Sequence, residues 1–200
     1  MSILKKTVYT FIVLCTGLLA AQEEKLFNEI DLEGWTAYGT ELWYVEDGVL
    51  VSESGPDKRS GYLTTNKKYK DFELTFEFKQ EKKGNSGVFV RSNIEEANVS
   101  GWQIEIAEPG HFTGGVHESF DRGWLKKPSL EKDKALKMGA WNVMRIKVVH
   151  NTITTWLNGT EMITLTDEKI SLGEGGIVLQ IKDGGGVKVK WRNIKLSKLD

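Results

Sequence analysis

The stretch FELTFEFK, Phe72 to Lys79, decides the fold class. Its phenylalanines and its leucine alternate strictly with polar or charged residues, so the four apolar side chains fall on one face of an extended chain. This two-residue period is typical of a strand with one buried and one solvated face. Segments of similar character lie on both sides of it, which predicts an all-β protein.

The further strands that the sequence predicts cover 43–45, 49–51, 88–91, 101–106, 141–149, 152–157, 176–181 and 187–196. Asp47-Gly48 and Asn158-Gly159 suit tight hairpin turns, because such residue pairs accept positive φ, and 183–186 is predicted to turn a final antiparallel pair. Only 126–138 is predicted as a helix or a long loop. Many short strands with glycine turns predict a β-sandwich of two antiparallel sheets.

The first 21 residues are predicted to be a secretory signal peptide. A short basic start precedes an apolar run from Val8 to Leu19, which is too short to span a bilayer, and two alanines supply a cleavage site near Ala21. The sequence therefore predicts a secreted or periplasmic protein in which 22–200 form a single domain.

The chain carries one cysteine, Cys15, and it lies inside the predicted signal peptide. Leu14 precedes it where a lipoprotein signal normally has a small residue, so no lipid anchor is expected. The predicted mature domain then has no disulfide, and its stability must come from its core.

The charge of the chain argues against several classes of partner. The 27 basic and 28 acidic side chains give a formal net charge of −1, and no basic stripe points to nucleic acid. No second apolar run indicates a membrane span.

The stretch GWQIEIAEPGHFTGGVHESFDRGWL, Gly101 to Leu125, holds most of the candidate functional residues. Its start alternates, so Trp102, Ile104 and Ile106 are predicted to be buried while Gln103 and Glu105 share the opposite face. Polar and aromatic residues then follow among glycines, at Glu108, His111, His117, Glu118, Asp121, Arg122 and Trp124. This mixture favours a sugar-binding cleft, which needs aromatic surfaces, hydrogen-bonding groups and a few titratable side chains.

Nine segments carry a family resemblance through their order and spacing. They are LFNEIDLEGW (26–35), WYVEDGVL (43–50), GYLTTNKKYKDFELTFEFK (61–79), NSGVFVR (85–91), GWQIEI (101–106), GGVHESFDRGWL (114–125), WN (141–142), LNG (157–159) and GGIVLQIKDGGGVKVKWRNIKL (175–196). Together they resemble the 3-keto-disaccharide hydrolase domain family. The resemblance implies a concanavalin-like jelly-roll sandwich, a fold shared with lectins and laminarinase-type glycosidases, and a carbohydrate substrate already oxidised to a ketone at C3.

The chemistry that the resemblance implies depends on this ketone. A 3-ketone acidifies the hydrogen on C2, so a base can remove it, an enolate forms, and the group on C1 departs by elimination before water adds back. Such a site needs a base, a cation or hydrogen-bond donors at the ketone oxygen, and an acid for the leaving oxygen.

Three residues are expected to share the catalytic work. Glu105 is expected to be the base, although a carboxylate that is merely ion-paired would look the same in sequence. His117 stands where relatives often have a tyrosine, and it is either the acid for the leaving group or a structural histidine. Arg91 matches the family motif NSG-x-x-x-R, and it is expected either to hold the ketone oxygen or to support Glu105 as an ion pair.

The remaining candidates are expected to bind substrate. Trp124 and Arg122, in DRGW, resemble a loop that covers the sugar ring, with the indole against its C–H face. Gln180 and Lys182 lie along the predicted strand near the C-terminus and can supply polar contacts. The full set of expected substrate-binding residues is Gln103, Glu108, Asp121, Arg122, Trp124, Gln180 and Lys182.

No cofactor is predicted. A divalent metal ion is a weak alternative, because His111 and His117 together with Glu105 or Asp121 could ligate one. However, a six-residue spacing in a glycine-rich loop matches no zinc motif.

Two other functions stay open. A laminarinase-type glycosidase would place two acids two strand-steps apart, but Gln103 and Ala107 occupy those positions beside Glu105, which disfavours this reading. A lectin-like module that binds carbohydrate without chemistry is the second alternative, and the acid, histidine and arginine near one strand are more than it needs.

Overall fold

The structure is a computed structural model that describes residues 23–95, 98–119, 121–171 and 173–199. The predicted signal peptide, residues 1–21, and with it Cys15, lie outside the described residues. Both therefore stay predictions.

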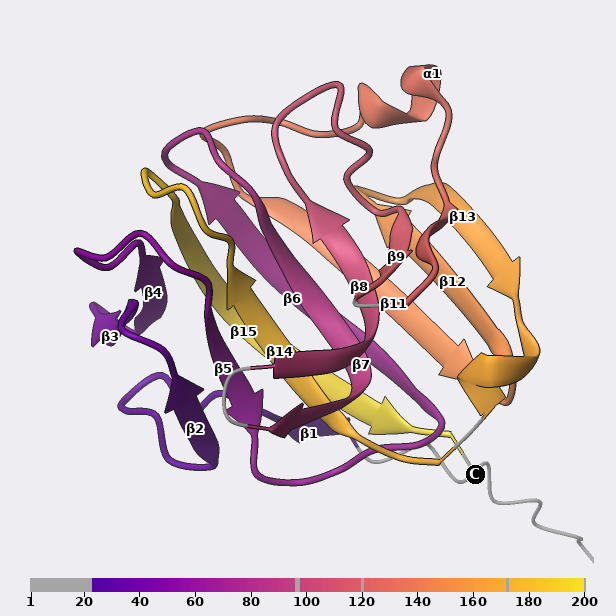
Figure 1. The fold of residues 1–200 in the computed structure, drawn as a ribbon, viewed down its shortest axis with the longest axis horizontal. Helices are drawn as coiled ribbons and strands as arrows, with labels where there is room; N and C mark the ends of the chain where they lie inside the picture. Colours follow the sequence, from indigo (N-terminus) through magenta and orange to yellow (C-terminus); the bar gives the residue numbers. More distant parts are fainter. Residues whose placement is uncertain (1–22, 96–97, 120, 172, 200) are drawn as a thin grey trace, which may run out of the picture.

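The described chain forms two antiparallel sheets that pack face to face (Figure 1). The larger sheet has the order β13 (Thr160–Thr166), β12 (Thr152–Leu157), β11 (Asn142–Val149), β6 (Phe72–Gln80), β15 (Lys188–Lys198), β4 (Val49–Glu53) and β3 (Leu42–Glu46), and β1 (Glu23–Lys25) also pairs with β15. The smaller sheet has the order β10 (Gly123–Lys126), β9 (Val116–Glu118), β8 (Asn98–Ile106), β7 (Ser86–Glu95), β14 (Gly176–Ile181), β5 (Gly61–Thr65) and β2 (Trp35–Tyr38). The predicted all-β, jelly-roll sandwich is confirmed.

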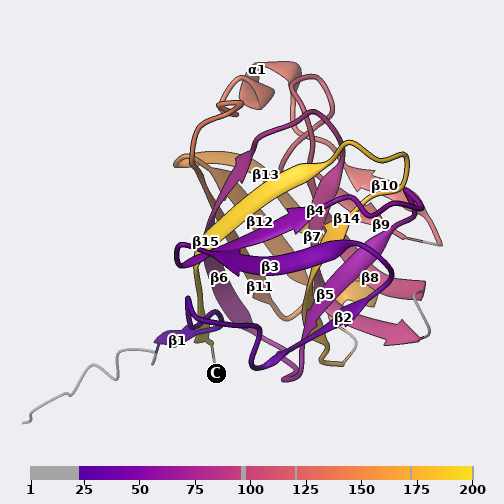
Figure 2. The ribbon, with the colours of Figure 1, turned by 90° about the vertical axis from the view of Figure 1, so that its left-hand side faces the viewer.

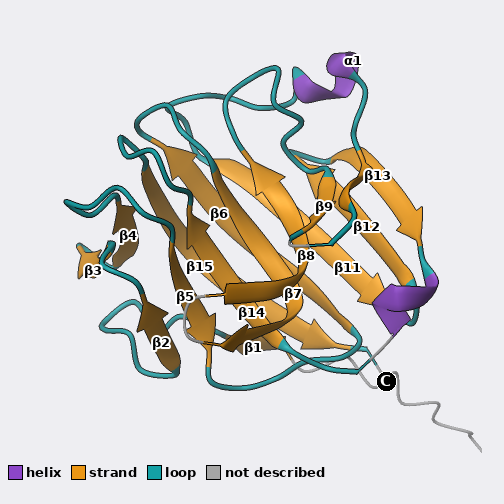
Figure 3. Cartoon of the chain, viewed as in Figure 1, coloured by secondary structure: helices purple, strands orange, loops and turns teal. Residues whose placement is uncertain are grey.

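Helical structure is sparse in the part of the chain that the structure describes (Figure 3). One turn of α-helix, α1 (Leu130–Asp133), begins after Ser129, which caps it, and a 3₁₀ turn covers Glu168–Ser171. The segment predicted as a helix or a long loop is thus mostly loop. None of the described helices is long and apolar enough to cross a membrane.

The core lies between the sheets, where the alternating strands place their apolar faces. Phe72, Leu74, Phe76 and Phe78 of β6 are all buried, and the rings of Phe76 and Phe78 pack against Trp191 of β15. From the smaller sheet, β8 adds Trp102, Ile104 and Ile106 to the same core, as predicted.

Two predicted hairpins are present, and one predicted pair is wrong. Asp47 and Gly48 join β3 to β4 with φ values of 51° and 74°, and Asn158 and Gly159 join β12 to β13 with φ values of 50° and 82°. In contrast, β14 and β15 lie in different sheets, so 183–186 carries the chain across the sandwich. Glycines at positive φ serve a crossover as well as a hairpin, and only the packing of both sheets distinguishes them. Figure 2 views the side of the molecule where β3 and β4 lie near β2 and β5.

The register of the smaller sheet aligns polar side chains on its outer face. Tyr62 of β5 lies opposite Gln180 of β14, which lies opposite Gly87 of β7, which in turn lies opposite Glu105 of β8. Because paired residues in a sheet point to the same side, this row faces away from the core. A neighbouring row continues it, with Gln103 opposite His117 of β9 and His117 opposite Trp124 of β10.

The end of β7 and the start of β8 border this polar region. The register shifts between Val90 and Asn93, and the hairpin beyond the shift turns across the outer face of the sheet (Figure 1). Phe89, Val99 and Val178 form a small buried cluster there, separate from the main core, and Tyr62 belongs to it. This small apolar cluster therefore borders the polar row at Tyr62, which belongs to both.

Candidate functional site

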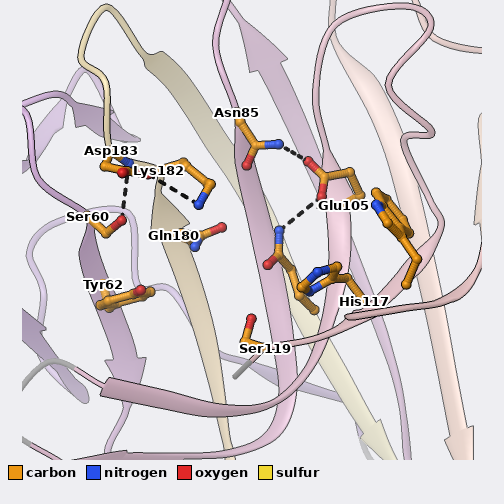
Figure 4. Close-up of a pocket in the computed structure, with 11 residues that line it drawn as sticks. Ser60, Tyr62, Asn85, Glu105, His117, Ser119, Gln180, Lys182 and Asp183 are labelled. Carbon is orange, nitrogen blue, oxygen red and sulfur yellow. Dashed lines mark hydrogen bonds and ion pairs between the residues drawn. The ribbon is translucent and has the colours of Figure 1, made fainter. Parts of the chain in front are cut away.

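A cavity of about 460 Å³ lies on the outer face of the smaller sheet (Figure 4). Its walls come from strands β5, β8, β9, β10 and β14 and from residues next to the ends of β5, β7, β9 and β14. The lining residues are Ser60, Tyr62, Asn85, Gln103, Glu105, His117, Ser119, Trp124, Gln180, Lys182 and Asp183. This volume is within the range of small-molecule sites, about 300–1,000 Å³.

Six of the residues that the sequence singled out lie together in this cavity: Gln103, Glu105, His117, Trp124, Gln180 and Lys182. They come from segments that are up to 79 residues apart along the chain, between Gln103 and Lys182. Period-2 alternation predicted that Gln103 and Glu105 share a face, and the sheet register adds His117, Trp124 and Gln180 to it.

Glu105 occupies an unusual environment for a carboxyl group. Only 4% of its surface is exposed, and its two oxygens accept hydrogen bonds from carboxamides. Asn85 Nδ2 donates to Oε1, and Gln103 Nε2 donates to Oε2 at 3.1 Å. Burial raises the pKa of Glu105 to about 8, although the Asn85 hydrogen bond and the positive charge of Lys182 act in the opposite direction. A carboxyl with this pKa exchanges protons near neutral pH, as a catalytic acid or base must.

His117 is a neutral imidazole at neutral pH. Burial lowers its pKa, and the nearby charge of Lys182 lowers it further. Its ring packs edge to face against the indole of Trp124, with 5.5 Å between the ring centroids. A neutral imidazole has one nitrogen that donates and one that accepts, so His117 can donate a hydrogen bond and can also take a proton.

Three buried polar atoms of lining residues have no hydrogen-bond partner among the residues that the structure describes. They are Asn85 Oδ1, His117 Nδ1 and Gln180 Oε1. Leaving such an atom unsatisfied costs about 1–3 kcal/mol each. Their presence in one cavity indicates that the site receives a polar ligand or water.

Lys182 supplies positive charge to this cavity. It follows directly after β14, where its main-chain N–H donates to the Asn85 carbonyl at 3.1 Å, and its Nζ lies 3.2 Å from Asp183 Oδ1. Asp183 in turn donates its main-chain N–H to Ser60 Oγ at 3.1 Å. Among the described residues that line the cavity, Lys182 is the one lysine or arginine.

Trp124 forms an aromatic edge of the cavity. Its side chain lies on the edge strand β10 and the residue is 37% exposed. Phe112 packs edge to face against the indole at 5.7 Å between centroids, and Lys127 Nζ lies 5.0 Å from the indole ring centre. An exposed indole that Phe112 and Lys127 hold in place suits contact with the C–H face of a sugar.

Arg91 does not line the cavity, which corrects the expectation that it contacts substrate. Its φ of 47° and the bulge after Val90 turn the side chain out of the alternation of β7. The guanidinium is fully buried, donates to the carbonyls of Lys70, His150 and Ile170, and pairs with Asp71 at 2.5 Å. The alternative role, an ion pair with Glu105, is also wrong, because the partner is Asp71.

Three further candidates lie outside the cavity and pair with surface charges. The chain leaves the sheet after β8, so Glu108 does not line the cavity. Its carboxylate lies 3.5 Å from Lys83 Nζ. Asp121 is exposed and pairs with Lys169 at 2.5 Å. Arg122 binds Glu118 and also Asp167, at 2.6 Å for the latter, so its side chain turns along the sandwich edge. The proposed covering role of Arg122 is therefore corrected.

The alternative of a metal site finds no support in the described part of the chain. No group of three or more histidine, cysteine, aspartate or glutamate side chains is placed to hold an ion there. His111, one of the suggested ligands, is solvent-exposed and lies 4.0 Å from Glu108.

Five lining residues escaped the sequence analysis: Ser60, Tyr62, Asn85, Ser119 and Asp183. Asn85 had a signal, because it is the first residue of the family motif NSG-x-x-x-R, which ends at Arg91. Ser60 and Asp183 lie on connections, where no periodicity predicts direction.

Comparisons with known proteins agree with the fold and place the chain among carbohydrate-related relatives. The family described as the 3-keto-alpha-glucoside-1,2-lyase-like domain matches residues 22–197. A protein of Bacteroides thetaiotaomicron named 3-keto-disaccharide hydrolase is 26% identical over 178 residues, a match that covers 74% of this chain. This chain spans 58% of the length of that relative.

Solved structures share the sandwich. A candidate glycosyl hydrolase from Parabacteroides distasonis superposes with a TM-score of 0.65 at 26% identity, over 89% of this chain and 100% of that one. The carbohydrate-binding module CBM66 from Bacillus subtilis gives a TM-score of 0.63 at 13% identity, over 82% of this chain and 96% of the module. The second likeness concerns the fold alone, since the same sandwich carries unrelated functions.

Proposed function

Because the chain belongs to the 3-keto-alpha-glucoside-1,2-lyase-like domain family, we propose that its cavity binds and cleaves glycosides that carry a ketone at C3. The name of the Bacteroides relative, which this chain matches over part of its length, supports this substrate class. The observation that carries the proposal is a buried carboxyl with a pKa of about 8, facing a neutral imidazole and a lysine in one cavity.

The reaction begins with the loss of the proton on C2. Ionised Glu105 takes this proton, the C2–H electron pair forms a C2–C3 double bond, and the ketone oxygen becomes an enolate. The enolate then reforms the ketone, a C1–C2 double bond appears, and the C1–O bond breaks with its electron pair on the leaving oxygen. Addition of water to the unsaturated sugar completes a net hydrolysis.

The other side chains stabilise the charges that this sequence creates. The positive charge of Lys182, which lines the cavity, stabilises the negative enolate oxygen. This is the role first expected of Arg91. His117, as a neutral imidazole, donates a hydrogen bond to the leaving oxygen, and the proton that Glu105 took from C2 passes to that oxygen, which restores the base. Trp124 and Gln180 hold the ring, through the apolar face of the indole and the unpartnered amide oxygen.

Ordinary glycoside hydrolysis fits this cavity less well. A retaining glycosidase uses two carboxyl groups that flank the bond, about 5–5.5 Å apart. The described lining residues include two acids, Glu105 and Asp183, and Asp183 is exposed and paired with Lys182. A binding module without chemistry has no need to bury a carboxyl whose pKa is near neutrality. We further propose export, to the periplasm or the medium, on the basis of residues 1–21.

The decisive experiment compares 3-keto and unoxidised forms of one disaccharide. The purified protein should convert the 3-keto form, leave the parent sugar intact, and react more slowly when C2 carries deuterium. The rate should be the same with and without a chelator.

Two matched variants complete this test. Glu105→Gln should abolish turnover while keeping binding, because glutamine keeps the shape but is no base. Glu108→Gln makes the same chemical change outside the cavity and should keep full activity. Efficient cleavage of the unoxidised sugar, or full activity of Glu105→Gln, contradicts the proposal.

A further inference from the structure

Asn85, Ser86 and Gly87 lie at the start of β7, next to Glu105, and the proposed function leaves their part open. We propose that this Asn-Ser-Gly segment positions the carboxyl of Glu105 by clamping it between two carboxamides. Asn85 supplies one carboxamide directly, and Gly87 makes room for the other, Gln103. The consequence for turnover rests on the proposed function, but the clamp itself does not.

Asn85 is held from both ends. Its Nδ2 donates to Glu105 Oε1 (Figure 4). Its main-chain carbonyl accepts the N–H of Lys182 at 3.1 Å. A side chain with a fixed main chain and one bound amide nitrogen has little freedom to rotate. Asn85 therefore fixes both the position of Oε1 and the start of the segment that bears Lys182.

Ser86 anchors the segment to the sheet. Its side chain is fully buried, and its Oγ donates to the carbonyl of Gln180 at 2.6 Å. In the ladder it lies opposite Ile106 of β8 and Ile181 of β14. Because Ser86 ties β7 to both neighbours, Asn85 and Gly87 keep their places relative to Glu105.

Gly87 is a glycine because of space rather than backbone conformation. Its φ lies outside the left-handed region, so an alanine would suit the strand. However, a Cβ at this position would lie 2.8 Å from both Cγ and Nε2 of Gln103. The side chain of Gln103 therefore lies over Gly87, and this path brings its Nε2 to Glu105 Oε2 at 3.1 Å.

The clamp leaves Glu105 with defined properties. Each oxygen of a carboxylate accepts about two hydrogen bonds, so one lone pair on each stays free for the cavity after the clamp has formed. Donors to the charged form stabilise it, which opposes the effect of burial on the proton affinity of Glu105. The clamp thus sets both the direction of the carboxyl and the pH at which it loses its proton.

The test measures the titration of the Glu105 carboxyl by NMR in the free protein, with ¹³C-labelled glutamate. Gly87→Ala and Gln103→Ala should each increase the proton affinity of Glu105 about tenfold, because each removes one hydrogen bond to a charged acceptor. Combined, they should have no greater effect than Gln103→Ala alone, since alanine at 103 has no side chain left to displace. Additive effects, or an unchanged titration in Gly87→Ala, overturn the role of Gly87.

Asn85→Leu tests the other arm of the clamp if Gly87→Ala does not fold. It keeps the size of the side chain without a donor and should increase the proton affinity of Glu105 by a similar factor, whereas an unchanged titration overturns the clamp. In turnover assays at neutral pH, these variants should lower kcat more than they raise KM. A shifted titration in a protein that does not act on 3-keto sugars would refute the proposed function and leave the clamp intact.

Discussion

The dependence of the rate on pH tests the proposed role of Glu105 most directly. Its pKa of about 8 means that about one-tenth of the molecules carry the ionised base at pH 7 and about nine-tenths at pH 9. If the ionised form takes the C2 proton, kcat/KM should rise about tenfold between these values. Lys182→Met should move the rise to higher pH, because the lysine charge favours the carboxylate.

The assay follows initial rates of a 3-keto disaccharide between pH 6 and 9.5, with released sugar measured by chromatography. Ketosugars also eliminate without enzyme in base, so Glu105→Gln at each pH supplies the blank. A rate that falls above pH 8 refutes the reasoning. It would show that Glu105 works in its protonated form, as the acid, and would move the base to His117, whose lowered pKa leaves it unprotonated.

Three other outcomes are expected. Arg91→Met should lower the free energy of unfolding by about 3–5 kcal/mol in urea titrations, because Asp71 is left without its buried partner, and a selective loss of kcat without a loss of stability would contradict this. Glu41 is 7% exposed and burial raises its pKa, so the fold becomes less stable as this carboxyl ionises with rising pH. Glu41→Gln should therefore raise Tm more at pH 8 than at pH 4. An equal gain in Tm at both pH values would contradict this. Trp124→Ala should raise KM about three- to tenfold with the pH profile unchanged, and a change in kcat alone would count against its contact with sugar.

Local patterns predicted the elements whose cause is local. FELTFEFK became β6 because every second side chain could enter the core, and Asp47-Gly48 became a hairpin because both residues reach positive φ. The shared face of Gln103 and Glu105 was predicted for the same reason, since one strand carries both. What depends on partners far along the chain was harder to predict: the pairing of β14 and β15 with other strands is decided by the packing of two sheets.

Arg91 shows the limit of alternation most clearly. Counting by twos from Phe89 places its side chain on the cavity face, but after Val90 the register with β8 shifts, because Arg91 and Ser92 of β7 stand against Gly101 alone. No residue type in 88–92 predicts the bulge. The carbonyls that bind the guanidinium come from three distant segments, and the sequence gives no sign that they meet.

The bonds between the two connections 54–60 and 183–187 bear on how this scaffold can change its choice of sugar. Asp183 and Gly184 donate their main-chain N–H groups to Ser60 Oγ and to the carbonyl of Lys58, at 3.1 and 2.9 Å. The wall that they form stands apart from the strands that carry Glu105 and His117. A different sugar can therefore be accommodated by exchanging 54–60 and 183–187 together, while Lys182, Glu105 and His117 stay in place. Exchange of only one connection would break the hydrogen bonds between the two, so they are expected to change together.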